Sequence, residues 1–575
     1  MRCLARIAYT LVPSIYFAYS DELQLVLGGF SPIMTSCEDN DRSTNAASEV
    51  PPRLAPTRSE GVDIFSVVVT LMKMTILKKI YGNQSLALVA DFYQFTALYA
   101  FWKANLHETK SCFHMFHRSS PFKGGYAICA GREYLEDWIT SFKMDSSDID
   151  YLASIEGNDG KRIFEDDNFF EYLTNFRFSC DVDAVPEGTV VFPHEPMIRT
   201  IGTVADALLI ESFGLCTLNS QTLFATLASR MVNAAKGDPV LDGGLRRAQG
   251  LDGALSATRA CYIGGIKGTS NTWAGKTLGI KAGGTMQHAF VMFFDSELEA
   301  FETYAKALPN NCIFLVDTYG TVGGIKNAIK VSIELKNKGY PPIGIRLDSG
   351  DLTFLSKIAR QMLDDAGLHE MKVGGSNDLD EQLISSLKSQ GATIASWVVG
   401  TKMLTSHSQP ALGGVYKMGA IQKNGTWIPK IKLSEQTIKT SNPGILNTLR
   451  FEKNGQFCGD IIYDELLLDP NKEELVAVNH NDAIRKKIYN IKKIDNHKVL
   501  EPSIRNGELA RKQPSLNEIR DYAKIQLSKL PESVRRFDNP HEYPTGIDLE
   551  LHHSKVNMIV SSRGGTDIYY SAFPR

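Results

Sequence analysis

The sequence predicts an α/β protein built around a parallel sheet or barrel. From about residue 260 onward, short apolar segments alternate with longer helical segments, and polar loops that contain glycine follow the apolar ones. Four such apolar segments stand in a row, at 313–316, 343–345, 371–373 and 393–399. Repeated strand, loop and helix units favour parallel strands, because a crossover helix commonly connects two of them.

The remaining elements follow from periodicity and from Gly and Pro punctuation. In chain order we expect a helix over 86–104, a short strand over 113–116, a turn over 121–125, β-structure over 183–201 and one or two long helices over 205–235. After residue 420 the chain has Lys-rich loops, short strands and a final helical stretch. No internal sequence repeat is found.

Composition excludes several classes of protein. The chain has 575 residues, of which 43% are hydrophobic and 22% charged, so it is neither mainly disordered nor collagen-like. Its formal net charge of −3 gives no global basic field that would call for nucleic acid. The nine cysteines form no CxxC pair, which fits a reducing compartment. No segment has the apolar length of a membrane span.

Residues 1–80 are expected to be an appendage outside the catalytic fold. Residues 1–20 place two Arg before an apolar stretch, which loosely imitates a signal peptide. Residues 34–60 are rich in Ser, Asn, Asp, Glu and Pro, as disordered linkers are. The missing disulfide pattern argues against secretion. A targeting segment and a wrongly assigned start codon therefore both stay open.

The strongest local signal is the segment RLDSGD at 346–351, directly after a predicted strand. It brings Arg346 together with two carboxylates, Asp348 and Asp351, at the strand end where α/β barrels carry their chemistry. Carboxylates can hold Mg²⁺ or ribose hydroxyls, and Arg can bind phosphate through two parallel hydrogen bonds. A solvated loop with an Arg–Asp pair explains the same residues equally well.

Three further loops contain residues suited to anion binding or catalysis. Gly400 and Thr401 follow a strand and can offer backbone and hydroxyl donors to a phosphate, although an ordinary turn has the same sequence. Arg246 stands among small residues that would let it approach a planar ligand, although adjacent Arg residues are usually solvated. His288 ends a Gly-rich loop and can be a nucleophile, an acid–base group or a core histidine.

From about Leu86 to about Leu549 the chain resembles the nicotinate phosphoribosyltransferases. The resemblance rests on nine motifs in the order in which that family has them. They are DFYQ at 91–94, FHRSSPFKGGYA at 116–127, GLRRAQG at 244–250, GTSN at 268–271, GTMQH at 284–288, DTY at 317–319, RLDSGD at 346–351, SNDLD at 376–380 and GGVYK at 413–417.

The resemblance implies an irregular, TIM-like α/β barrel beside an α/β domain formed from N-terminal and later segments. On this basis we expect an N-terminal α/β domain over 81–205 and a phosphoribosyltransferase barrel over 206–415. A C-terminal segment over 416–575 would pack on the N-terminal domain. The implied assembly is a cytoplasmic homodimer with its sites at the subunit interface and no nucleic-acid or membrane partner.

The implied activity is synthesis of nicotinate mononucleotide and pyrophosphate from nicotinate and phosphoribosyl pyrophosphate. This is the first step of NAD (pyridine nucleotide) biosynthesis from nicotinate. The family couples it to ATP hydrolysis through a phosphohistidine, so the enzyme is classed as a ligase although its chemistry is that of a glycosyltransferase. Mg²⁺ or Mn²⁺ is the implied cofactor, and ATP is a co-substrate.

The resemblance also implies roles for single residues. His288 matches the phosphorylated histidine, which replaces its interpretation as a core residue. Asp348 is expected to hold the ribose or its Mg²⁺, and Arg346 to contact substrate phosphate or the carboxylate of the base. The residues expected to line the 5′-phosphate pocket are Asn377, Gly400 and Thr401.

The pyridine ring is expected between Arg246 on one face and Tyr93, donated by the second subunit, on the other. Ser270 would lie beside the carbonyl substituent of the ring, where nicotinamide-using relatives have Asp. A Ser hydroxyl can donate to a carboxylate and adds no charge, so Ser270 favours nicotinate. Arg118 and Lys417 are further candidates for contacts with pyrophosphate.

Three positions depart from the family pattern. Val398 stands where Gly is usual and can narrow the phosphate loop, Gly320 stands where Asp is common, and Asp242 stands where Glu is favoured. Two alternatives remain, namely the sister enzyme that uses nicotinamide and an inactive paralogue that acts as a binding partner. The retention of His288 and Asp348 argues against inactivity.

Overall fold

A computed structural model describes residues 75–562 except 435–438, 470 and 481. The predicted appendage at 1–80 lies almost entirely outside the described residues. Its last residues form helix α4 (Ile76–Tyr81), in which Ile76 and Leu77 are buried in a hydrophobic core. The backbone amide of Ile76 donates to Oδ2 of Asp137 at 2.7 Å. Ordered structure therefore begins before residue 80.

The first of three large sheets is antiparallel and joins distant parts of the chain. Its strand order is β13-β12-β1-β5-β3-β19-β20. Its strands are β1 (Lys110–His117), β3 (Asp181–Ala184), β5 (Ile198–Thr203), β12 (Gly414–Lys423), β13 (Thr426–Pro429), β19 (Glu501–Arg505) and β20 (Glu508–Leu509). Because three early strands lie in its middle with two late strands on each side, the prediction of a domain built from N-terminal and later segments is confirmed.

Helices from the N-terminal part pack around this sheet with many aromatic contacts, such as the stacked rings of Trp138 and Phe213, 4.7 Å apart. They are α5 (Phe92–Lys103), α6 (Arg132–Ser141), α7 (Ser146–Ser154) and α8 (Asp167–Asn175). A short helix η1 (Pro121–Lys123) and the paired strands β2 (Ala127–Ile128) and β4 (Val190–Val191) complete this part. The predicted helix over 86–104 begins six residues late, because Asp91 and Gln94 form a capping box there.

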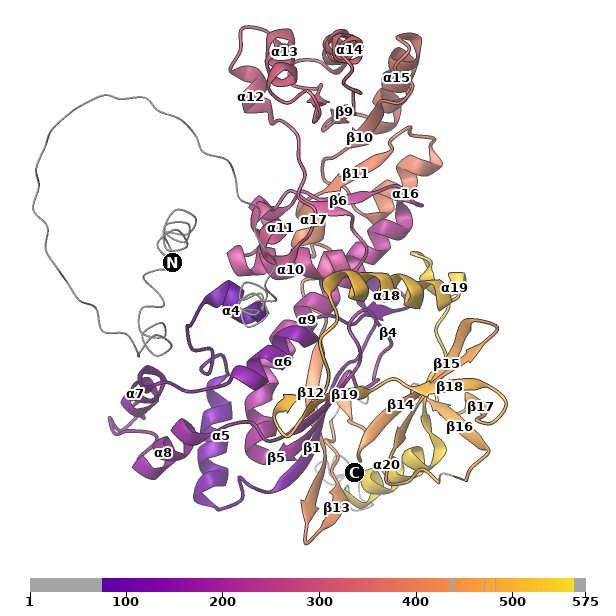
Figure 1. Ribbon diagram of the computed structural model, residues 1–575. Helices are drawn as coiled ribbons and strands as arrows, with labels where there is room; N and C mark the ends of the chain where they lie inside the picture. Colours follow the sequence, from indigo (N-terminus) through magenta and orange to yellow (C-terminus); the bar gives the residue numbers. More distant parts are fainter. Residues whose placement is uncertain (1–74, 435–438, 470, 481, 563–575) are drawn as a thin grey trace, which may run out of the picture. The chain divides into compact units, whose positions relative to one another are not determined.

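One 31-residue helix, α9 (Val204–Ala234), replaces the predicted one or two helices over 205–235. It begins with a capping box formed by Thr203 and Asp206. Its first half is buried in the core beneath the antiparallel sheet and its last turns in the core of the parallel sheet. In Figure 1, α9 runs from beside β1 and β5 toward α10 (Leu251–Ile263). Gly214 lies within this helix, and its missing side chain leaves room for Met115.

The second sheet confirms the predicted parallel strands. Its order is β7-β6-β11-β10-β9-β8, every pair is parallel, and it forms a half-barrel. The strands are β6 (Val240–Asp242), β7 (Gly268–Thr269), β8 (Ile313–Leu315), β9 (Gly344–Leu347), β10 (Lys372–Gly375) and β11 (Ser396–Val399). The four predicted apolar segments supply β8 to β11, whose central side chains are fully buried.

Helices connect these strands, as the predicted strand-and-helix repeat requires. They are η2 (Leu245–Arg247), α10 (Leu251–Ile263), α11 (Thr272–Leu278), α12 (His288–Met292), α13 (Glu297–Ala307), α14 (Thr321–Asn337), α15 (Leu352–Asp365), α16 (Glu381–Ser389) and α17 (Thr401–Leu404). Asp351 and Asp380 cap α15 and α16 by accepting from Phe354 N at 3.0 Å and Leu383 N at 2.8 Å.

The third sheet belongs to the C-terminal part, in the order β17-β16-β21-β15-β14-β18. Its strands are β14 (Leu446–Lys453), β15 (Gln456–Asp464), β16 (Glu474–Asn479), β17 (Lys486–Asn490), β18 (Asp495–Lys498) and β21 (Thr545–Asp548). Three helices accompany it: α18 (Leu516–Lys529), α19 (Glu532–Arg535) and α20 (Leu549–Ser562). The short strands and final helices predicted after residue 420 are therefore present.

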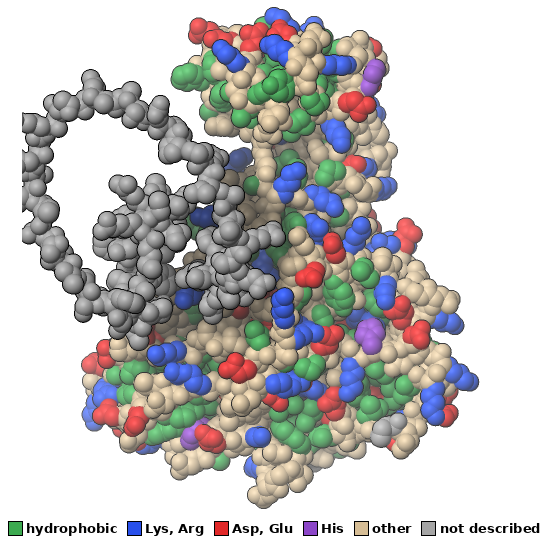
Figure 2. All heavy atoms as spheres, in the orientation of Figure 1, with side chains coloured by type: hydrophobic (Ala, Val, Ile, Leu, Met, Phe, Trp, Pro, Cys, Tyr) green, Lys and Arg blue, Asp and Glu red, His purple; other side chains and the backbone are tan. Residues whose placement is uncertain are grey.

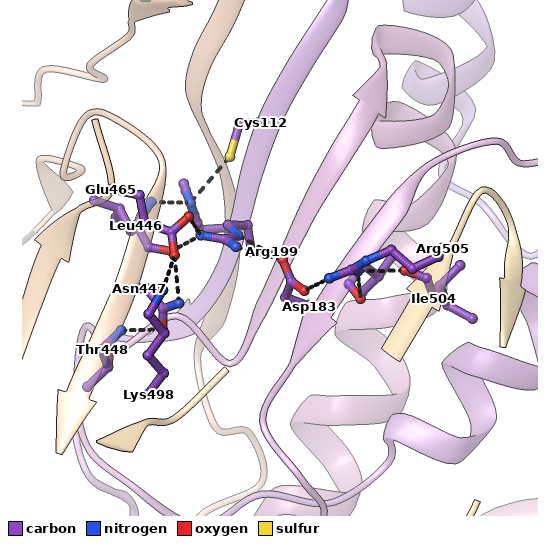
Figure 3. A network of polar contacts seen from close by, with 12 residues as sticks. Cys112, Asp183, Arg199, Leu446, Asn447, Thr448, Glu465, Lys498, Ile504 and Arg505 are labelled. Atoms are coloured by element: carbon purple, nitrogen blue, oxygen red, sulfur yellow. Dashed lines mark hydrogen bonds and ion pairs between the residues drawn. The ribbon is translucent and has the colours of Figure 1, made fainter. Parts of the chain in front are cut away.

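A buried ionic network joins the first and third sheets (Figure 3). Arg199 of β5 pairs with Asp183 of β3 at 2.7 Å and with Glu465 at 2.9 Å, and it donates to the carbonyl of Leu446 at 3.3 Å. Burial opposes ionisation of Asp183, but Arg199 and Arg505 outweigh it and hold its pKa below the ordinary value. The C-terminal sheet is thus tied to the N-terminal sheet through paired charges.

None of the helices in the described part of the chain has both the length and the apolar character needed to cross a bilayer. The seven cysteines that the structure describes are all free. Acidic and basic side chains are interspersed over the face shown in Figure 2, as the near-zero net charge leads one to expect.

Candidate active site

The C-terminal ends of parallel strands β6 to β11 carry most of the predicted site residues. Parallel strands point the same way, so their carboxyl ends meet at one edge of the sheet. Arg246 lies in η2 after β6, and Ser270 follows β7. The residues at the other strand ends are Arg346 and Asp348 at β9, Asn377 after β10, and Gly400 and Thr401 after β11.

His288 lies between a hydroxyl and a carboxylate. It is the first residue of α12, and its Nδ1 is 3.1 Å from Oγ1 of Thr318. Its Nε2 is 3.6 Å from Oδ2 of Asp348. The side chain is 40% exposed, so His288 is not a core histidine. The two neighbours fix the ring and leave it open to a reacting group.

Asp348 is held by residues from two neighbouring strand ends. The hydroxyl of Ser376, after β10, donates to its Oδ1. Its backbone amide donates to Oδ2 of Asp317, after β8, at 3.2 Å, and Ser349 Oγ donates to the same oxygen at 2.5 Å. The other oxygen of Asp317, Oδ1, is buried without a hydrogen-bond partner among the described residues.

The Arg346 guanidinium has donors to spare. Its Nη2 reaches the carbonyl of Met286 at 3.5 Å, whereas its Nε is buried without a partner among the described residues. Burial lowers its pKa, Asp348 and Asp317 oppose that shift, and Arg246 adds to it. Two guanidinium groups therefore lie close enough to repel each other, which an anionic ligand between them would relieve.

Asp242 ties together the loops that carry Arg246 and Ser270. It is 1% exposed, and its carboxylate accepts from Thr269 Oγ1 at 2.6 Å, from Thr258 Oγ1 at 2.9 Å and from the amide of Gly244 at 2.8 Å. Its backbone carbonyl accepts from the amide of Ser270 at 2.7 Å. Burial raises the pKa of Asp242, although these hydrogen bonds favour the charged form.

The loops after β6 and β11 approach each other through glycines. A Cβ on Gly244 would lie 2.8 Å from the carbonyl oxygen of Gly400, so a side chain there would separate the loops. A Cβ on Gly243 would lie 2.7 Å from Cγ1 of Val398. Val398, where the family usually has Gly, thus packs against the β6 loop. Asn377 is exposed and left-handed, with φ 89°.

The other three predicted residues form a second cluster, at the antiparallel sheet. Lys417 Nζ is 3.9 Å from Oε1 of Glu211 on α9. Burial lowers the pKa of Lys417, Glu211 opposes the shift, and Lys432 and Arg118 add to it. Burial and Glu211 raise the pKa of Tyr93, whose side chain remains exposed. No hydrogen bond or ion pair between described residues joins this cluster to His288 or Asp348.

Several residues of the two clusters had no role in the sequence interpretation. Thr318 and Asp317 stand in the DTY motif after an apolar strand, and Ser376 begins SNDLD, so their place after strands was the available signal. Glu211 is the only charged residue of α9 between Asp206 and Arg230. Asp242 was noted only as a departure from the family pattern.

The residues present fit a Mg²⁺ ion that arrives with a phosphate substrate. Among the described residues no three His, Cys, Asp or Glu side chains gather as a complete protein metal site would need. Mg²⁺ in phosphate-binding sites commonly has only one or two protein carboxylates and takes its other oxygens from phosphate and water. Asp348, with the unpartnered oxygen of Asp317 from the neighbouring strand, meets that need.

Comparison with known proteins gives consistent matches along the chain. Residues 88–219 match the nicotinate phosphoribosyltransferase N-terminal domain, and residues 447–555 match the C-terminal domain of that family. The chain is 38% identical over 484 residues to the nicotinate phosphoribosyltransferase of Bacillus subtilis, covering 83% of this chain and 96% of that protein. It is 34% identical over 535 residues to that of Caenorhabditis elegans, covering 82% and 93%.

The fold also matches a solved structure. The crystal structure of human nicotinic acid phosphoribosyltransferase superposes with a TM-score of 0.72 at 27% sequence identity. The match covers 82% of this chain and all of the human chain. The α/β architecture described above is therefore that of a known enzyme fold.

Proposed function

Because the chain belongs to the nicotinate phosphoribosyltransferase family, we propose that it transfers the phosphoribosyl group of phosphoribosyl pyrophosphate to nicotinate. The products are nicotinate mononucleotide and pyrophosphate, which makes this the first step from nicotinate to NAD. The observation that carries the proposal is the convergence of Arg346, Asp348 and His288 at one edge of the parallel sheet.

The transfer needs positioning and charge stabilisation more than proton transfer. The pyridine nitrogen has a free lone pair and attacks the anomeric carbon as the bond to pyrophosphate breaks, so no general base is required. The ribose ring gains positive charge and the leaving group negative charge. Asp348, fixed by Ser376 and Asp317, would hold the ribose hydroxyls, and the unpaired Nε–H of Arg346 would meet a phosphate or the carboxylate of nicotinate.

Base choice follows from the loops that Asp242 positions. Ser270 is exposed directly after β7, where its hydroxyl can donate to the carboxylate of nicotinate. Arg246 on the neighbouring loop would pack against the pyridine ring and supply opposite charge. Asn377, Gly400 and Thr401 would hold the 5′-phosphate, since Gly400 and Thr401 begin α17 and offer backbone donors.

ATP would be coupled through His288. A ring nitrogen attacks the γ-phosphorus of ATP, the bond to the β-phosphate oxygen breaks, and ADP leaves; water later cleaves the phosphohistidine to phosphate. Thr318 and Asp348 hold the ring in place for this step. Because His288 lies beside Asp348, a phosphate on the ring would alter the binding of the phosphoribosyl substrate.

When Mg²⁺ or Mn²⁺ is bound, the cation offsets the negative charge of the leaving pyrophosphate. Asp348 would hold it, with Asp317 next to it.

The second cluster supports a homodimer with a composite site. Arg118 and Lys417 are cations suited to pyrophosphate, yet neither forms a hydrogen bond or ion pair with a described strand-end residue of its own subunit. We propose that the dimer, in the cytoplasm, brings Tyr93 of the partner subunit and these cations onto the strand ends.

The decisive experiment measures product formation from labelled nicotinate and labelled nicotinamide, each with phosphoribosyl pyrophosphate and with or without ATP. Nicotinate mononucleotide should form from nicotinate and little product from nicotinamide. Asp348→Ala should nearly abolish turnover while the protein stays folded, and Asp365→Ala, at an exposed helix end, should match the wild type. Product from nicotinamide alone would identify the sister activity, and no product from either base would refute the proposal.

A further inference from the structure

A cavity of about 340 Å³ lies away from the strand-end cluster. It is enclosed by the loop after β1, the turn between β4 and β5, the end of β16 and the segment before β21. Of the residues with a proposed role in catalysis, only Arg118 lines it. The lining side chains that matter for its chemistry are Arg118, Ser119, His194, His480, Glu542 and Tyr543.

Two stacked histidines line this cavity, and cations lie near them. The rings of His194 and His480 stack with centroids 4.5 Å apart. Burial, then Lys555 and Arg118, lower the pKa of His194 to about 4. Burial, His194 and Lys555 lower that of His480, and burial lowers the pKa of Lys555 on α20 to about 8. The charged groups that perturb these side chains are all cations.

Several nitrogen atoms at or next to the cavity have no hydrogen-bond partner. Arg118 Nε and His480 Nε2 are buried without a hydrogen-bond partner among the described residues. His117, the last residue of β1 and next to His194, is fully buried, and neither of its ring nitrogens has a partner among the described residues. Buried polar groups of folded proteins nearly always have partners, and leaving one unpaired costs about 1–3 kcal/mol.

The acidic groups nearby do not neutralise the cations near the two histidines. Tyr543 lines the cavity, and its hydroxyl donates to Oδ1 of Asp460 at 2.9 Å. Asp460 in turn pairs with Arg450 at 2.6 Å, and Glu195 lies 3.5 Å from the same guanidinium. Glu542 is exposed at the rim. Asp460 and Glu195, the buried carboxylates, therefore have their own cation, Arg450.

We propose that this cavity binds a phosphate group, either inorganic phosphate or a small phosphate ester. Such a group carries several acceptor oxygens and negative charge, so it satisfies the unpaired Nε–H of Arg118 and, in the tautomer with its proton on Nε2, that of His480, and it offsets the charge of Arg118 and Lys555. The hydroxyl of Ser119 is a further donor in the lining. The volume is at the lower end of the range for small-molecule sites.

The cavity lies outside the strand-end cluster proposed to hold the ribose and the 5′-phosphate, because no strand-end residue of the parallel sheet lines it. Its link to catalysis is Arg118, which is also a candidate for pyrophosphate. Occupation of the cavity would hold the Arg118 side chain on the cavity side. The ligand would thereby compete for one of the cations of the second cluster.

The test is equilibrium dialysis of the full chain with labelled inorganic phosphate and, in a second arm, labelled ribose 5-phosphate. The pocket variant combines His194→Asn with His480→Gln; Asn suits the left-handed backbone of His194, whose φ is 70°. It should bind phosphate at least about tenfold more weakly than the wild type. Arg346→Gln, which changes the strand-end cluster, and the exposed His369→Gln should keep the cavity site.

Tighter binding of ribose 5-phosphate than of phosphate would identify an ester as the ligand, and equal or weaker binding would identify inorganic phosphate. Unchanged phosphate binding in the pocket variant would overturn the proposal, as would loss of all binding in Arg346→Gln. Circular dichroism in phosphate-free buffer checks the fold of each variant. If the double variant does not fold, anomalous diffraction from wild-type crystals soaked in tungstate replaces it. The proposal requires an anomalous peak between Arg118 and His480, and the lack of such a peak would overturn it.

Discussion

The hydroxyl of Thr269 donates a 2.6 Å hydrogen bond to Oδ2 of Asp242, a carboxylate that also holds Thr258 and the amide of Gly244. A single buried side chain thus fixes two strand-end loops relative to each other. Asp242 itself is 1% exposed, so its influence on the substrate would be exerted through the loops it holds.

Asp242→Asn should impair the enzyme through positioning. An amide can accept at only one of its two ends, so at least one of the three hydrogen bonds is lost or inverted. We expect kcat/KM for nicotinate to fall about tenfold or more and the free energy of unfolding to fall by about 1–3 kcal/mol. Steady-state kinetics and urea unfolding measure both. Asp242→Glu should partly restore kcat/KM. A loss of unfolding free energy in Asp242→Asn without a change in KM would indicate a structural role only.

His288→Ala should uncouple ATP from transfer. Alanine has no nucleophilic nitrogen, while the pyridine needs no base, so nicotinate mononucleotide should still form at high substrate. ATP should change kcat/KM for phosphoribosyl pyrophosphate by less than about twofold in the variant. Thr318→Ala, which removes the hydroxyl 3.1 Å from Nδ1, should weaken the stimulation without abolishing it. Full ATP stimulation of His288→Ala would refute the assignment.

Ser270→Asp should change the choice of base. A carboxylate at this position would repel the carboxylate of nicotinate but accept from the amide of nicotinamide. We expect kcat/KM for nicotinate to fall about 10- to 100-fold and use of nicotinamide to rise from a low baseline. Ser270→Ala is the matched control and should lose less. If the Asp variant keeps its nicotinate efficiency within about twofold, Ser270 does not discriminate.

Because of Asp137, the free energy of unfolding should fall as the pH rises from about 4 to about 6. Burial and then Glu133 raise its pKa from 3.8 to about 6, so the folded state binds this proton more tightly than the unfolded state. The stabilisation is complete below the pKa that Asp137 has in the unfolded state. It is lost as the pH rises past the pKa of Asp137 in the folded state. Asp137→Asn should therefore gain about 2–3 kcal/mol relative to the wild type across this range. Urea unfolding at several pH values checks it.

Two truncations should have different outcomes. Removal of residues 1–73 should leave the enzyme folded and active, because Met74–Arg575 forms one compact unit. Removal of residues 1–81 also deletes α4, whose Ile76 and Leu77 are buried and whose first amide bonds to Asp137. We expect it to cost about 3 kcal/mol or more in unfolding free energy. Equal thermal midpoints for the two truncations would contradict this.

The strand-end residues were predictable from sequence because their position follows from order along the chain. An apolar run followed by Asp317 or Arg346 places those side chains at one edge of a parallel sheet whatever the packing is. The capping box at Asp91 was readable from the sequence, yet apolar residues before it obscured the start of α5. Periodicity left open whether residues 205–235 held one helix or two, and the structure has one continuous helix, α9.

The second cluster and the support of Asp242 could not be predicted in the same way. Glu211 and Lys417 are more than 200 residues apart in the chain. Their ion pair depends on how β12, which carries Lys417, pairs with β1. Thr258 and Thr269 donate to the carboxylate of Asp242, and nothing in the sequence around either Thr indicates that contact. Tertiary packing decides such contacts, and periodicity contains no information about it.

Helix α9 also bears on how the protein melts. At 1.5 Å per residue its 31 residues span about 46 Å. One end is buried in the core beneath the antiparallel sheet, and the other carries Arg230, which pairs with Glu381 of α16 at 3.0 Å in the interior beside the parallel sheet. Neither core can open without exposing part of the same rod. The amides along its centre should therefore exchange with solvent only through global unfolding, and the two cores should lose structure in one cooperative transition.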